Sequence, residues 1–243
     1  MMAVLLAGGR GTRLRPLTVT VPKPLLPIGD ESILEVVLGQ LRSAGFDRVV
    51  ITLGHMARLF AAVIGDGARW GMQVDFVFED EPLGTAGPLR IVRDLEDDFL
   101  VMNGDILTTI DYRRLFAFHR EKRALGTIAV TKRTVHIDYG VVTALPDAQL
   151  AHYHEKPRID YAVSMGINVL SRRCLEHVPA GQRFDMPDLM MAMHRKEARV
   201  FCFGTDCYWQ DIGRMEDYEA ACADFQKDPQ RFRGGTAVTT EAP

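Results

Sequence analysis

The sequence of 243 residues predicts an α/β fold in which helices cover both faces of a mostly parallel central sheet. Three observations lead to this prediction. Short, nearly continuous apolar runs recur through the first half of the chain, as expected for strands that are buried on both faces. Helical patterns follow the first four of these runs, as they do in βαβ units. Hydrophobic residues make up 47% and charged residues 25% of the chain, which is typical of a globular domain.

The predicted strands and helices alternate through the first half of the chain. We assign strands to the apolar runs 3–6, 49–53, 74–78, 99–102 and 127–131. The first helix carries the clearest signals, because Ser32 and Glu35 form a capping box and Gly45 supplies a stop. The helical spacing of apolar residues recurs over 56–64, and a third helix is expected to follow Asp111.

From about residue 135 the pattern changes to shorter strand-like pieces. These lie at 140–144, 150–154 and 163–170, and a further strand at 200–203 stands between helices at 186–194 and 214–225. We expect residues 1–226 to form a single domain, in which the N-terminal half binds one ligand and the C-terminal half closes over another. Residues 227–243 have little to bury and are expected to form a disordered tail.

Charge and composition exclude several classes of protein. The net charge of −3 provides no large positive field, so we expect no nucleic-acid partner. No stretch approaches the ~18 apolar residues of a membrane span, and the apolar run 3–6 is too short for a secretion signal. The four cysteines form no CxxC pair, which favours reduced thiols. We therefore expect a cytoplasmic protein with no membrane partner.

A glycine-rich loop follows the first predicted strand. It contains Leu6, Ala7, Gly8, Gly9, Gly11 and Thr12, and it carries the cations Arg10, Arg13, Arg15 and Lys23. Backbone amides in such a loop can approach and bind phosphates. A dinucleotide fingerprint is excluded because Leu14 stands where a third glycine is required, and no Walker A sequence is present. Because a loop of this length is uncommon unless it is functional, we interpret it as a clamp for a triphosphate.

The order and spacing of the motifs resemble the sugar-1-phosphate nucleotidyltransferases, also called nucleotide-sugar pyrophosphorylases. The resemblance begins with residues 9–18 and Pro22-Lys23-Pro24, and it extends from about residue 2 to residue 225. Further matching motifs are residues 81–87, Asn103-Gly104-Asp105, residues 139–142, Glu155-Lys156-Pro157 and residues 209–213. The resemblance implies a three-layer Rossmann-like nucleotidyltransferase fold with a mostly parallel, mixed central sheet.

The resemblance also implies a reaction, in which a sugar 1-phosphate attacks the α-phosphorus of a nucleoside triphosphate and pyrophosphate leaves. The nucleophile is already an anionic oxygen, so the protein has to neutralise charge and align the two substrates. By the family match, Arg13 and Lys23 are the catalytic cations. The alternative for an arginine in such a loop is a solvated surface charge. The residues that the match assigns to the nucleotide are Leu6, Ala7, Gly8, Gly9, Gly11, Thr12, Glu79, Gly84, Thr85 and Gly104.

Two aspartates are the candidate ligands of Mg²⁺, which is the expected cofactor. Asp105 follows an apolar strand at its carboxyl end, where ligands collect in open α/β sheets. Asp211 follows Tyr208-Trp209-Gln210 much later in the chain. Carboxylate oxygens suit Mg²⁺. Read from the residues alone, either aspartate could equally be a helix N-cap, and it is the resemblance that favours metal binding.

Contacts with the sugar phosphate are expected from the second half of the chain. The family match assigns Lys156 to the sugar phosphate, where its ammonium would act as a point charge, and Glu155 and Gly140 to sugar hydroxyls. The alternative for Glu155 and Lys156 is a solvated charge pair. Many family members carry Asn-x-Gly where this chain has Ser164, Met165 and Gly166. Because serine reaches less far than asparagine, the usual contact to a sugar hydroxyl is not expected from this position, and the sugar need not be ordinary glucose or mannose.

Glu79 is the residue from which we infer the base. The resemblance places it where the family reads the Watson–Crick edge, a position at which uridylyl- and thymidylyltransferases tend to carry glutamine. An ionised carboxylate only accepts hydrogen bonds, and guanine presents two adjacent donors on that edge. GTP is therefore favoured, and the motifs are most like those of the mannose- or heptose-1-phosphate guanylyltransferase branch. The alternative is that Glu79, Asp80 and Glu81 form an acidic solvated loop.

Other functions stay open at this point. The main alternative is a uridylyl- or thymidylyltransferase that acts on a hexose or amino-sugar 1-phosphate. A regulatory homologue that only binds nucleotide sugar is a second alternative, although every candidate catalytic and metal-binding residue is present. The expected partners are a nucleoside triphosphate and a sugar 1-phosphate, and a homodimer is compatible with the sequence.

Overall fold

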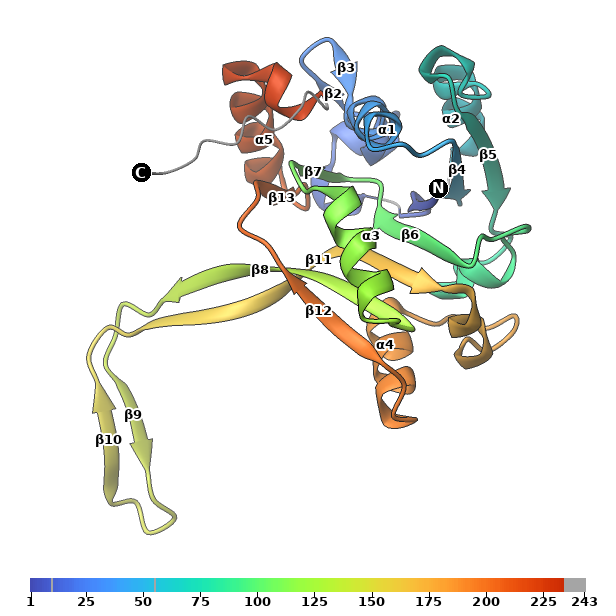
Figure 1. Cartoon of the computed structure of the whole chain (residues 1–243). Coiled ribbons are helices and arrows are strands. Elements are labelled where there is room, and N and C mark those ends of the chain that lie inside the picture. The colour runs from blue at the N-terminus through green and yellow to red at the C-terminus, as the bar shows by residue number, and fades with distance from the viewer. Residues whose placement is uncertain (10, 55, 234–243) are drawn as a thin grey trace, which may run out of the picture.

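The computed structural model describes residues 1–9, 11–54 and 56–233. Its centre is a seven-stranded sheet with the strand order β12-β8-β11-β6-β1-β4-β5 (Figure 1). Every strand of this sheet except β11 runs in the same direction. The strands are β1 (Met2–Leu6), β4 (Arg48–Leu53), β5 (Gln73–Phe78), β6 (Asp98–Asn103), β8 (Gly126–His136), β11 (Arg158–Ser171) and β12 (Val200–Gly204). The prediction of a mostly parallel, mixed sheet is confirmed.

Helices cover both faces of the sheet, which gives three layers. The side chains of β1 alternate between the layers, with Ala3 and Leu5 on one face and Met2 and Val4 on the other. The first face is covered by α1, α2 and α3, and the second by α4. The helices are α1 (Ile33–Ser43), α2 (Ala57–Ile64), α3 (Tyr112–Glu121), α4 (Met186–Arg195) and α5 (Met215–Lys227). The three-layer prediction is thereby confirmed, and no described helix is both long and apolar enough to cross a bilayer.

Local sequence signals account for where the helices begin. Ser32 Oγ accepts a hydrogen bond from the Glu35 amide, and the Glu35 carboxylate accepts one from the Ser32 amide, so the predicted capping box is confirmed. Asp111 caps α3 by accepting from the Arg114 amide at 3.0 Å. These bonds satisfy amides that would otherwise have no partner at the first turn.

Short two-stranded sheets support the regions around the central sheet. They pair β2 (Pro27–Ile28) with β3 (Glu31–Ser32), β7 (Ile106–Thr108) with β13 (Trp209–Asp211), and β9 (Val141–Ala144) with β10 (Leu150–His154). The β7–β13 pair joins the strand end that carries Asp105 to the segment that carries Asp211. Two distant parts of the chain are thus fixed next to each other.

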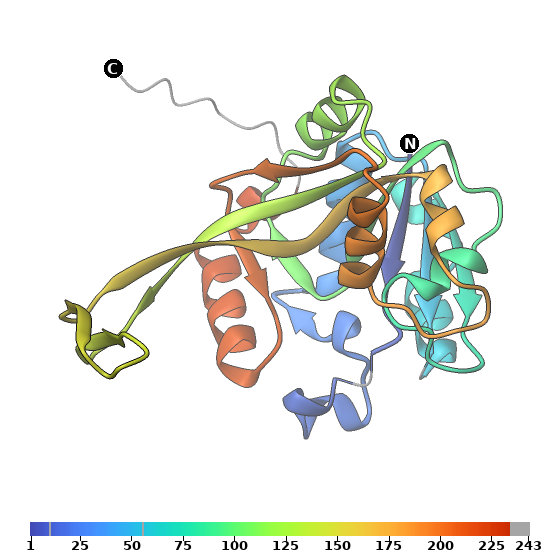
Figure 2. The ribbon, with the colours of Figure 1, turned by 90° about the horizontal axis from the view of Figure 1, so that it is seen from below.

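Beyond the sheet, β8 and β11 continue as a two-stranded ribbon that ends in the β9–β10 hairpin. We call residues 131–163 the arm. Figure 1 and Figure 2 both show the arm projecting away from the layered body. The arm extends outward in this structure, and the expectation that the second half of the chain closes over a ligand stays a prediction.

Two further expectations are corrected. The helical pattern expected after β5 is only a 3₁₀ helix at Gly87–Arg90, because the glycine- and proline-containing segment there cannot form a longer helix. The tail expected from residue 227 is ordered up to Arg233, since α5 reaches Lys227 and a 3₁₀ helix follows at Pro229–Phe232. Phe232 is completely buried, which is why this segment is held. Residues 234–243 of the expected tail lie outside the described residues.

Candidate active site

Three adjoining cavities open where β1 ends, between β6 on one side and β4 on the other. This is the point at which the strand order changes direction, where open α/β sheets bind their ligands. We name them the Glu79 cavity (about 660 Å³), the methionine cavity (about 480 Å³) and the loop cavity (about 240 Å³). Leu6 lines all three. A ligand with several parts can therefore span them.

The Glu79 cavity contains most of the residues predicted to bind a nucleotide. The predicted residues that line it are Leu6, Gly8, Gly9, Glu79, Gly84, Thr85 and the metal candidate Asp105. Gly104 lies behind this wall, because it is buried and its amide donates to the Leu6 carbonyl oxygen at 3.0 Å. Gly104 therefore sets the spacing between the ends of β1 and β6.

The Glu79 carboxylate is held in place by its surroundings. Its Oε2 accepts a hydrogen bond from the Leu83 amide at 2.9 Å, and burial raises the pKa of the carboxyl although this bond opposes the shift. A β-carbon built on Gly8 would come within 2.9 Å of Glu79 Oε1, so Gly8 leaves the room that this carboxylate occupies. Oε1 and the second lone pair of Oε2 stay available to a ligand.

The loop cavity is formed by the glycine-rich loop itself. Its lining residues are Leu6, Ala7, Gly9, Gly11, Thr12, Arg13, Lys23, Pro24 and Asp105. The loop winds through three short 3₁₀ helices, and Thr18 Oγ1 ties it together by donating to the Gly11 carbonyl oxygen at 2.8 Å. The structure thus brings Arg13 and Lys23 to one cavity. Arg15 is exposed and is not among the described residues that line the three cavities, and Arg10 lies outside the described residues.

Lys23 lies between the two predicted metal ligands. Its Nζ is 2.5 Å from Asp105 Oδ2 and 4.0 Å from Asp211 Oδ1. Burial raises the pKa of the Asp211 carboxyl, and the charge of Asp105 adds to this, while Lys23 and Arg13 act in the opposite direction. The two carboxylates are therefore close enough to repel each other, and a cation stabilises both of them.

The donor set at this position fits a hard divalent cation. Asp105 Oδ1 is buried and has no hydrogen-bond partner among the described residues. A carboxylate oxygen in that state is stabilised by a ligand that brings positive charge. Two carboxylates with room for phosphate oxygens and water match the ligands that Mg²⁺ prefers. The alternative that Asp105 or Asp211 is a helix N-cap is wrong, because neither residue caps a described helix.

The methionine cavity adjoins the Glu79 cavity through Leu6, Thr85 and Asn103. It contains Ser164 and Gly166 from β11, opposite Met186, Met190 and Met191 from α4. Gly166 has a φ of +69°, and a β-carbon there would lie 2.8 Å from Asn103 Nδ2. Ser164 Oγ accepts from the Gly166 amide at 3.4 Å, so part of its polar capacity is used within the strand. The cavity is largely apolar, with a few polar groups at one side.

Three predicted sugar-phosphate residues lie elsewhere. Gly140, Glu155 and Lys156 stand on the arm, beside the hairpin, and are not among the residues that line the three cavities. A β-carbon built on Gly140 would collide with the hydroxyl end of Tyr153, and Tyr153 Oη donates to Glu155 Oε2 at 3.1 Å. Glu155 and Lys156 are exposed. The structure therefore brings Ser164 and Gly166 together with the nucleotide residues but not the three arm residues.

Sequence reasoning missed Arg183 and Asp185, which line the Glu79 cavity from the segment before α4. Asp185 Oδ1 accepts from the Thr85 amide at 3.0 Å, and its Oδ2 pairs with Arg183 at 3.4 Å. The sequence signal that could have identified them is a pair of opposite charges directly before a helix with a proline in its first turn. Trp209 belongs to the motif at residues 209–213, and its Nε1 donates to the Met165 carbonyl oxygen beside the methionine cavity.

Comparison with known proteins adds independent information. Over residues 2–228 the chain matches the profile of a family described as nucleotidyl transferase. It is 33% identical over 239 residues to a UTP–glucose-1-phosphate uridylyltransferase of Synechocystis sp., covering 90% of this chain and 61% of the relative. It is 31% identical over 230 residues to a mannose-1-phosphate guanylyltransferase of Mycobacterium tuberculosis, covering 92% and 64%. The chain thus spans less than two thirds of the length of these relatives.

Solved structures show the same architecture. HddC from Yersinia pseudotuberculosis superimposes with a TM-score of 0.72 at 28% identity, covering 92% of this chain and 99% of that one. The same protein complexed with GMP-PN gives a TM-score of 0.70 at 25% identity. The family match spans nearly all of the described residues and agrees with the motifs that carried the resemblance. The chain therefore belongs to the nucleotidyl transferase family.

Proposed function

We propose that this protein transfers a nucleotidyl group from a nucleoside triphosphate, with GTP preferred, to a sugar 1-phosphate. The observation that carries the proposal is the position of Lys23 between Asp105 and Asp211, where the loop cavity meets the other two. Anionic groups from two substrates can meet there without a nucleophile or strong base from the protein. The regulatory alternative is disfavoured because a purely binding protein has no need of this arrangement.

In the proposed reaction an oxygen of the sugar phosphate forms a bond to the α-phosphorus, and the bond from that phosphorus to the bridging oxygen of pyrophosphate breaks. The glycine-loop amides would bind the triphosphate, and Arg13 and Lys23 would stabilise the charge that develops on the departing pyrophosphate. Asp105 and Asp211 would hold Mg²⁺, which when bound supplies charge neutralisation for the phosphates. Proton transfer is not required of any side chain.

The preference for guanine rests on Glu79. Its side chain lines the Glu79 cavity, and the free lone pairs of its carboxylate can accept from two adjacent donors, which guanine offers. The complex of HddC with GMP-PN supports this preference, because that protein is similar to this chain along its whole length. The uridylyltransferase relative at 33% identity favours the second candidate, a uridylyl- or thymidylyltransferase.

The sugar would occupy the methionine cavity, beside the Glu79 cavity. Ser164, Gly166 and Asn168 provide its polar groups, and the methionines of α4 provide an apolar wall. Lys156 is proposed as the cation for the sugar phosphate, and Glu155 and Gly140 as contacts to hydroxyls. Four free thiols fit a reducing compartment, so the proposal places the enzyme in the cytoplasm.

The test is a screen of pyrophosphate release with GTP, UTP, dTTP, ATP and CTP against a panel of sugar 1-phosphates. We expect GTP to be the best triphosphate, and Glu79→Gln to lower the GTP-to-UTP ratio of kcat/KM by about 10²–10⁴. Glu81→Gln is the matched control, since Glu81 is exposed in the same loop and does not line the Glu79 cavity. Absence of pyrophosphate release with every pair would overturn the activity. A wild-type preference for UTP or dTTP would overturn only the choice of base.

A further inference from the structure

The methionine cavity lacks the positive charge that a sugar phosphate requires. Among the described residues that line it, Asp211 alone is charged, and its charge is negative. A phosphate monoester is close to a dianion at neutral pH, so a cation has to come from outside the cavity. Lys156 is the cation that the proposed function assigns to this phosphate, and the present inference rests on that assignment.

Lys156 is too far along the arm to reach the cavity of its own copy. From Ser164 at the cavity to Arg158, β11 pairs with β8 without interruption, from Val130 to His136. Lys156 lies eight positions before Ser164, and an extended strand rises ~3.3 Å per residue, which places Lys156 about 26 Å away. A lysine side chain spans only a small part of that distance.

The arm is built as a stiff extension. The Ile137 amide donates to the Pro157 carbonyl oxygen at 3.1 Å, which continues the ladder past the last paired residues. Asp160 accepts from Thr134 Oγ1 at 2.6 Å and pairs with Lys132 at 2.7 Å across the two strands. Folding the arm back onto its own cavity would break several of these bonds. The positive φ of +44° at Lys156 also fixes the backbone at the end of the ribbon.

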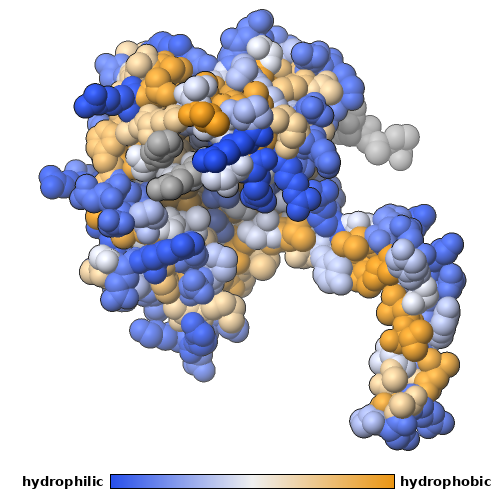
Figure 3. All heavy atoms as spheres, turned by 180° about the vertical axis from the view of Figure 1, so that it is seen from behind, coloured by the Kyte–Doolittle hydropathy of each residue, from blue (hydrophilic) through white to orange (hydrophobic). Residues whose placement is uncertain are grey.

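The surface of the arm indicates that it is covered in solution. Its exposed large apolar side chains are Val135, Tyr139, Val142, Leu145, Leu150, Tyr153 and Tyr161, and Tyr139 is 79% exposed. Figure 3 shows a band of apolar residues along the arm. A two-stranded hairpin alone is at most marginally stable in water, and both of its edges are open. Apolar side chains at this density favour an interface.

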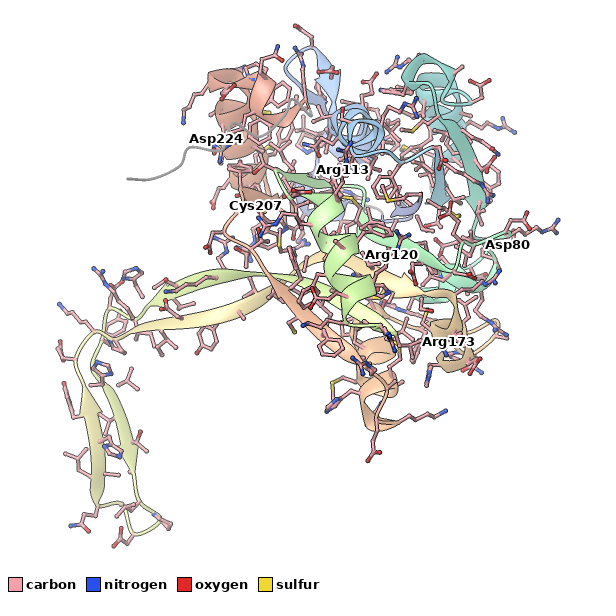
Figure 4. The ribbon with its side chains drawn as sticks, in the orientation of Figure 1. Asp80, Arg113, Arg120, Arg173, Cys207 and Asp224 are labelled. Carbon is pink, nitrogen blue, oxygen red and sulfur yellow. The ribbon has the colours of Figure 1, made fainter. Side chains whose placement is uncertain are left out.

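The cations around the cavity within one copy are already engaged. Lys23, 4.0 Å from Asp211 of this cavity, pairs with Asp105 in the loop cavity. Lys132 and Arg133 lie at the base of the arm and line a separate cavity of about 290 Å³. Cys207 also lines it, and Figure 4 labels Cys207 on the body of the molecule. Lys132 pairs with Asp160, and the Arg133 guanidinium lies over the Trp209 ring, 5.6 Å from its centre. Neither lines the methionine cavity.

We propose that the protein acts as an arm-exchanged homodimer, in which the arm of each copy lies over the methionine cavity of the other and brings Lys156 to the sugar phosphate there. A second copy is the occupant that fits, because each copy offers a cavity without a cation and an arm that carries one. Such an interface is isologous, so the same contact forms twice and the assembly closes at two copies. Each active site is then composed of two chains.

Complementation between two inactive variants tests this proposal. Arg13→Ala disables the body of one copy, and Lys156→Ala disables the arm of the other, where we expect kcat/KM for the sugar phosphate to fall about 10- to 100-fold. The two chains are co-expressed with different affinity tags and purified through both. The doubly tagged dimer then contains one intact site, and we expect about half of the wild-type turnover.

Two matched combinations control the experiment. Arg13→Ala paired with Lys23→Ala leaves both bodies disabled. The turnover of this dimer should therefore not exceed that of either variant alone. Arg133→Ala tests the cation at the base of the arm, and its kcat/KM is expected to stay within a few-fold of wild type. If no doubly tagged protein is recovered, or if it shows no gain in turnover, the proposal is overturned. A Lys156→Ala variant with unchanged sugar-phosphate KM and kcat overturns it as well.

A measurement of molecular mass separates this proposal from the proposed function. Light scattering is expected to give a dimer for the wild type and a monomer for Leu150→Asp, which places a charge in the apolar band of the arm. Val63→Asp, at an exposed apolar position of α2, is expected to stay dimeric. A wild-type monomer at micromolar concentration overturns arm exchange. A dimer that Leu150→Asp dissociates, with no pyrophosphate release by the wild type, overturns the proposed function and leaves arm exchange standing.

Discussion

Thr85 is hydrogen-bonded both to the Asp185 side chain and to the backbone of the next residue, Met186. Asp185 Oδ1 accepts from the Thr85 amide at 3.0 Å, and Thr85 Oγ1 accepts from the Met186 amide at 2.7 Å. Asp185 occupies the N-cap position of α4, but its own side chain makes no capping bond, and the hydroxyl of Thr85 serves as the cap instead. The loop at the Glu79 cavity and the helix at the methionine cavity are therefore fixed to one another.

The first prediction follows from this contact. Thr85→Val keeps the shape of the side chain and removes the acceptor, so the Met186 amide loses its partner at the helix start. We expect the free energy of unfolding to fall by about 0.5–2 kcal/mol, the usual cost of losing a cap. Urea denaturation followed by circular dichroism measures it. Thr20→Val, at an exposed position, should leave the midpoint unchanged, and an equal loss there would contradict the capping role.

A second prediction concerns the loop cavity. Arg13→Ala should lower kcat by ~10²–10³, as is usual when one preorganised partner of the transition state is removed. Arg15→Ala is the control, because Arg15 lies two residues away in the same loop and does not line the cavity. Steady-state pyrophosphate release measures both. Equal effects of the two substitutions would show that the loop responds to net charge rather than to the position of Arg13.

The third prediction concerns the metal. Asp105→Asn and Asp211→Asn should each raise the Mg²⁺ concentration for half-maximal turnover by about 10-fold or more, because an amide oxygen carries no full charge. Calorimetric titration of Mg²⁺ in the presence of the triphosphate gives a readout independent of turnover. Asp30→Asn at an exposed turn is the control. Unchanged Mg²⁺ binding in both variants would show that these aspartates are not metal ligands.

The fourth prediction uses the titration of Glu79. Burial raises the pKa of this carboxyl in the folded chain, so the folded state binds more protons than the unfolded state in the window just above the ordinary pKa of a glutamate. The stability that comes from this group is therefore fully present at low pH and is lost as pH rises through the raised pKa. Glu79→Gln does not titrate, and its stability relative to wild type should increase between pH 4 and pH 7.

Urea denaturation of both proteins at several pH values measures this difference. Glu81→Gln, in the exposed part of the loop, should show no such trend. A flat difference for Glu79→Gln would mean that Glu79 belongs to a solvated acidic loop, and the base-recognition proposal would lose its support.

A fifth prediction concerns the end of the ordered chain. Phe232 stacks on Phe225 with ring centres 5.6 Å apart, and its carbonyl oxygen accepts from Gln40 Nε2 at 2.8 Å. A chain that ends at residue 226 loses this buried ring, and we expect about 3–5 kcal/mol of stability to be lost with it. A chain that ends at residue 233 is the control. Thermal unfolding that is the same for both would show that Phe232 contributes nothing.

Local sequence signals predicted the buried body of the fold well. The strands around β1 are apolar on both faces, and the start of α1 is marked by Ser32 and Glu35, so each could be recognised without knowledge of its neighbours. The course of the arm could not be predicted in this way. Most residues of its strands are exposed, and whether such a ribbon folds back or extends depends on contacts that no short window of sequence contains.

The candidate site also combines residues that a local motif predicts with residues that only distant contacts bring together. Arg13, Lys23 and the glycines around them lie in one continuous motif, and the structure gathers them at one cavity. Asp185 is held at the site because it accepts a hydrogen bond from the Thr85 amide, 100 residues earlier in the chain, and Arg183 pairs with Asp185. Nothing in the residues next to Asp185 indicates that partner. Their role comes from tertiary packing alone.

The last helix supports the segment that follows the glycine-rich loop, and this determines when the loop can become ordered during synthesis. Tyr218 Oη donates to the Pro27 carbonyl oxygen at 2.6 Å across a sequence separation of 191 residues, and a β-carbon on Gly29 would lie 2.9 Å from the Phe225 ring. At ~5–20 residues per second, a ribosome needs about 10–40 s to make the chain between these contacts. The glycine loop thus leaves the exit tunnel long before its support does, and we expect the loop to become ordered only after Tyr218 has been synthesised.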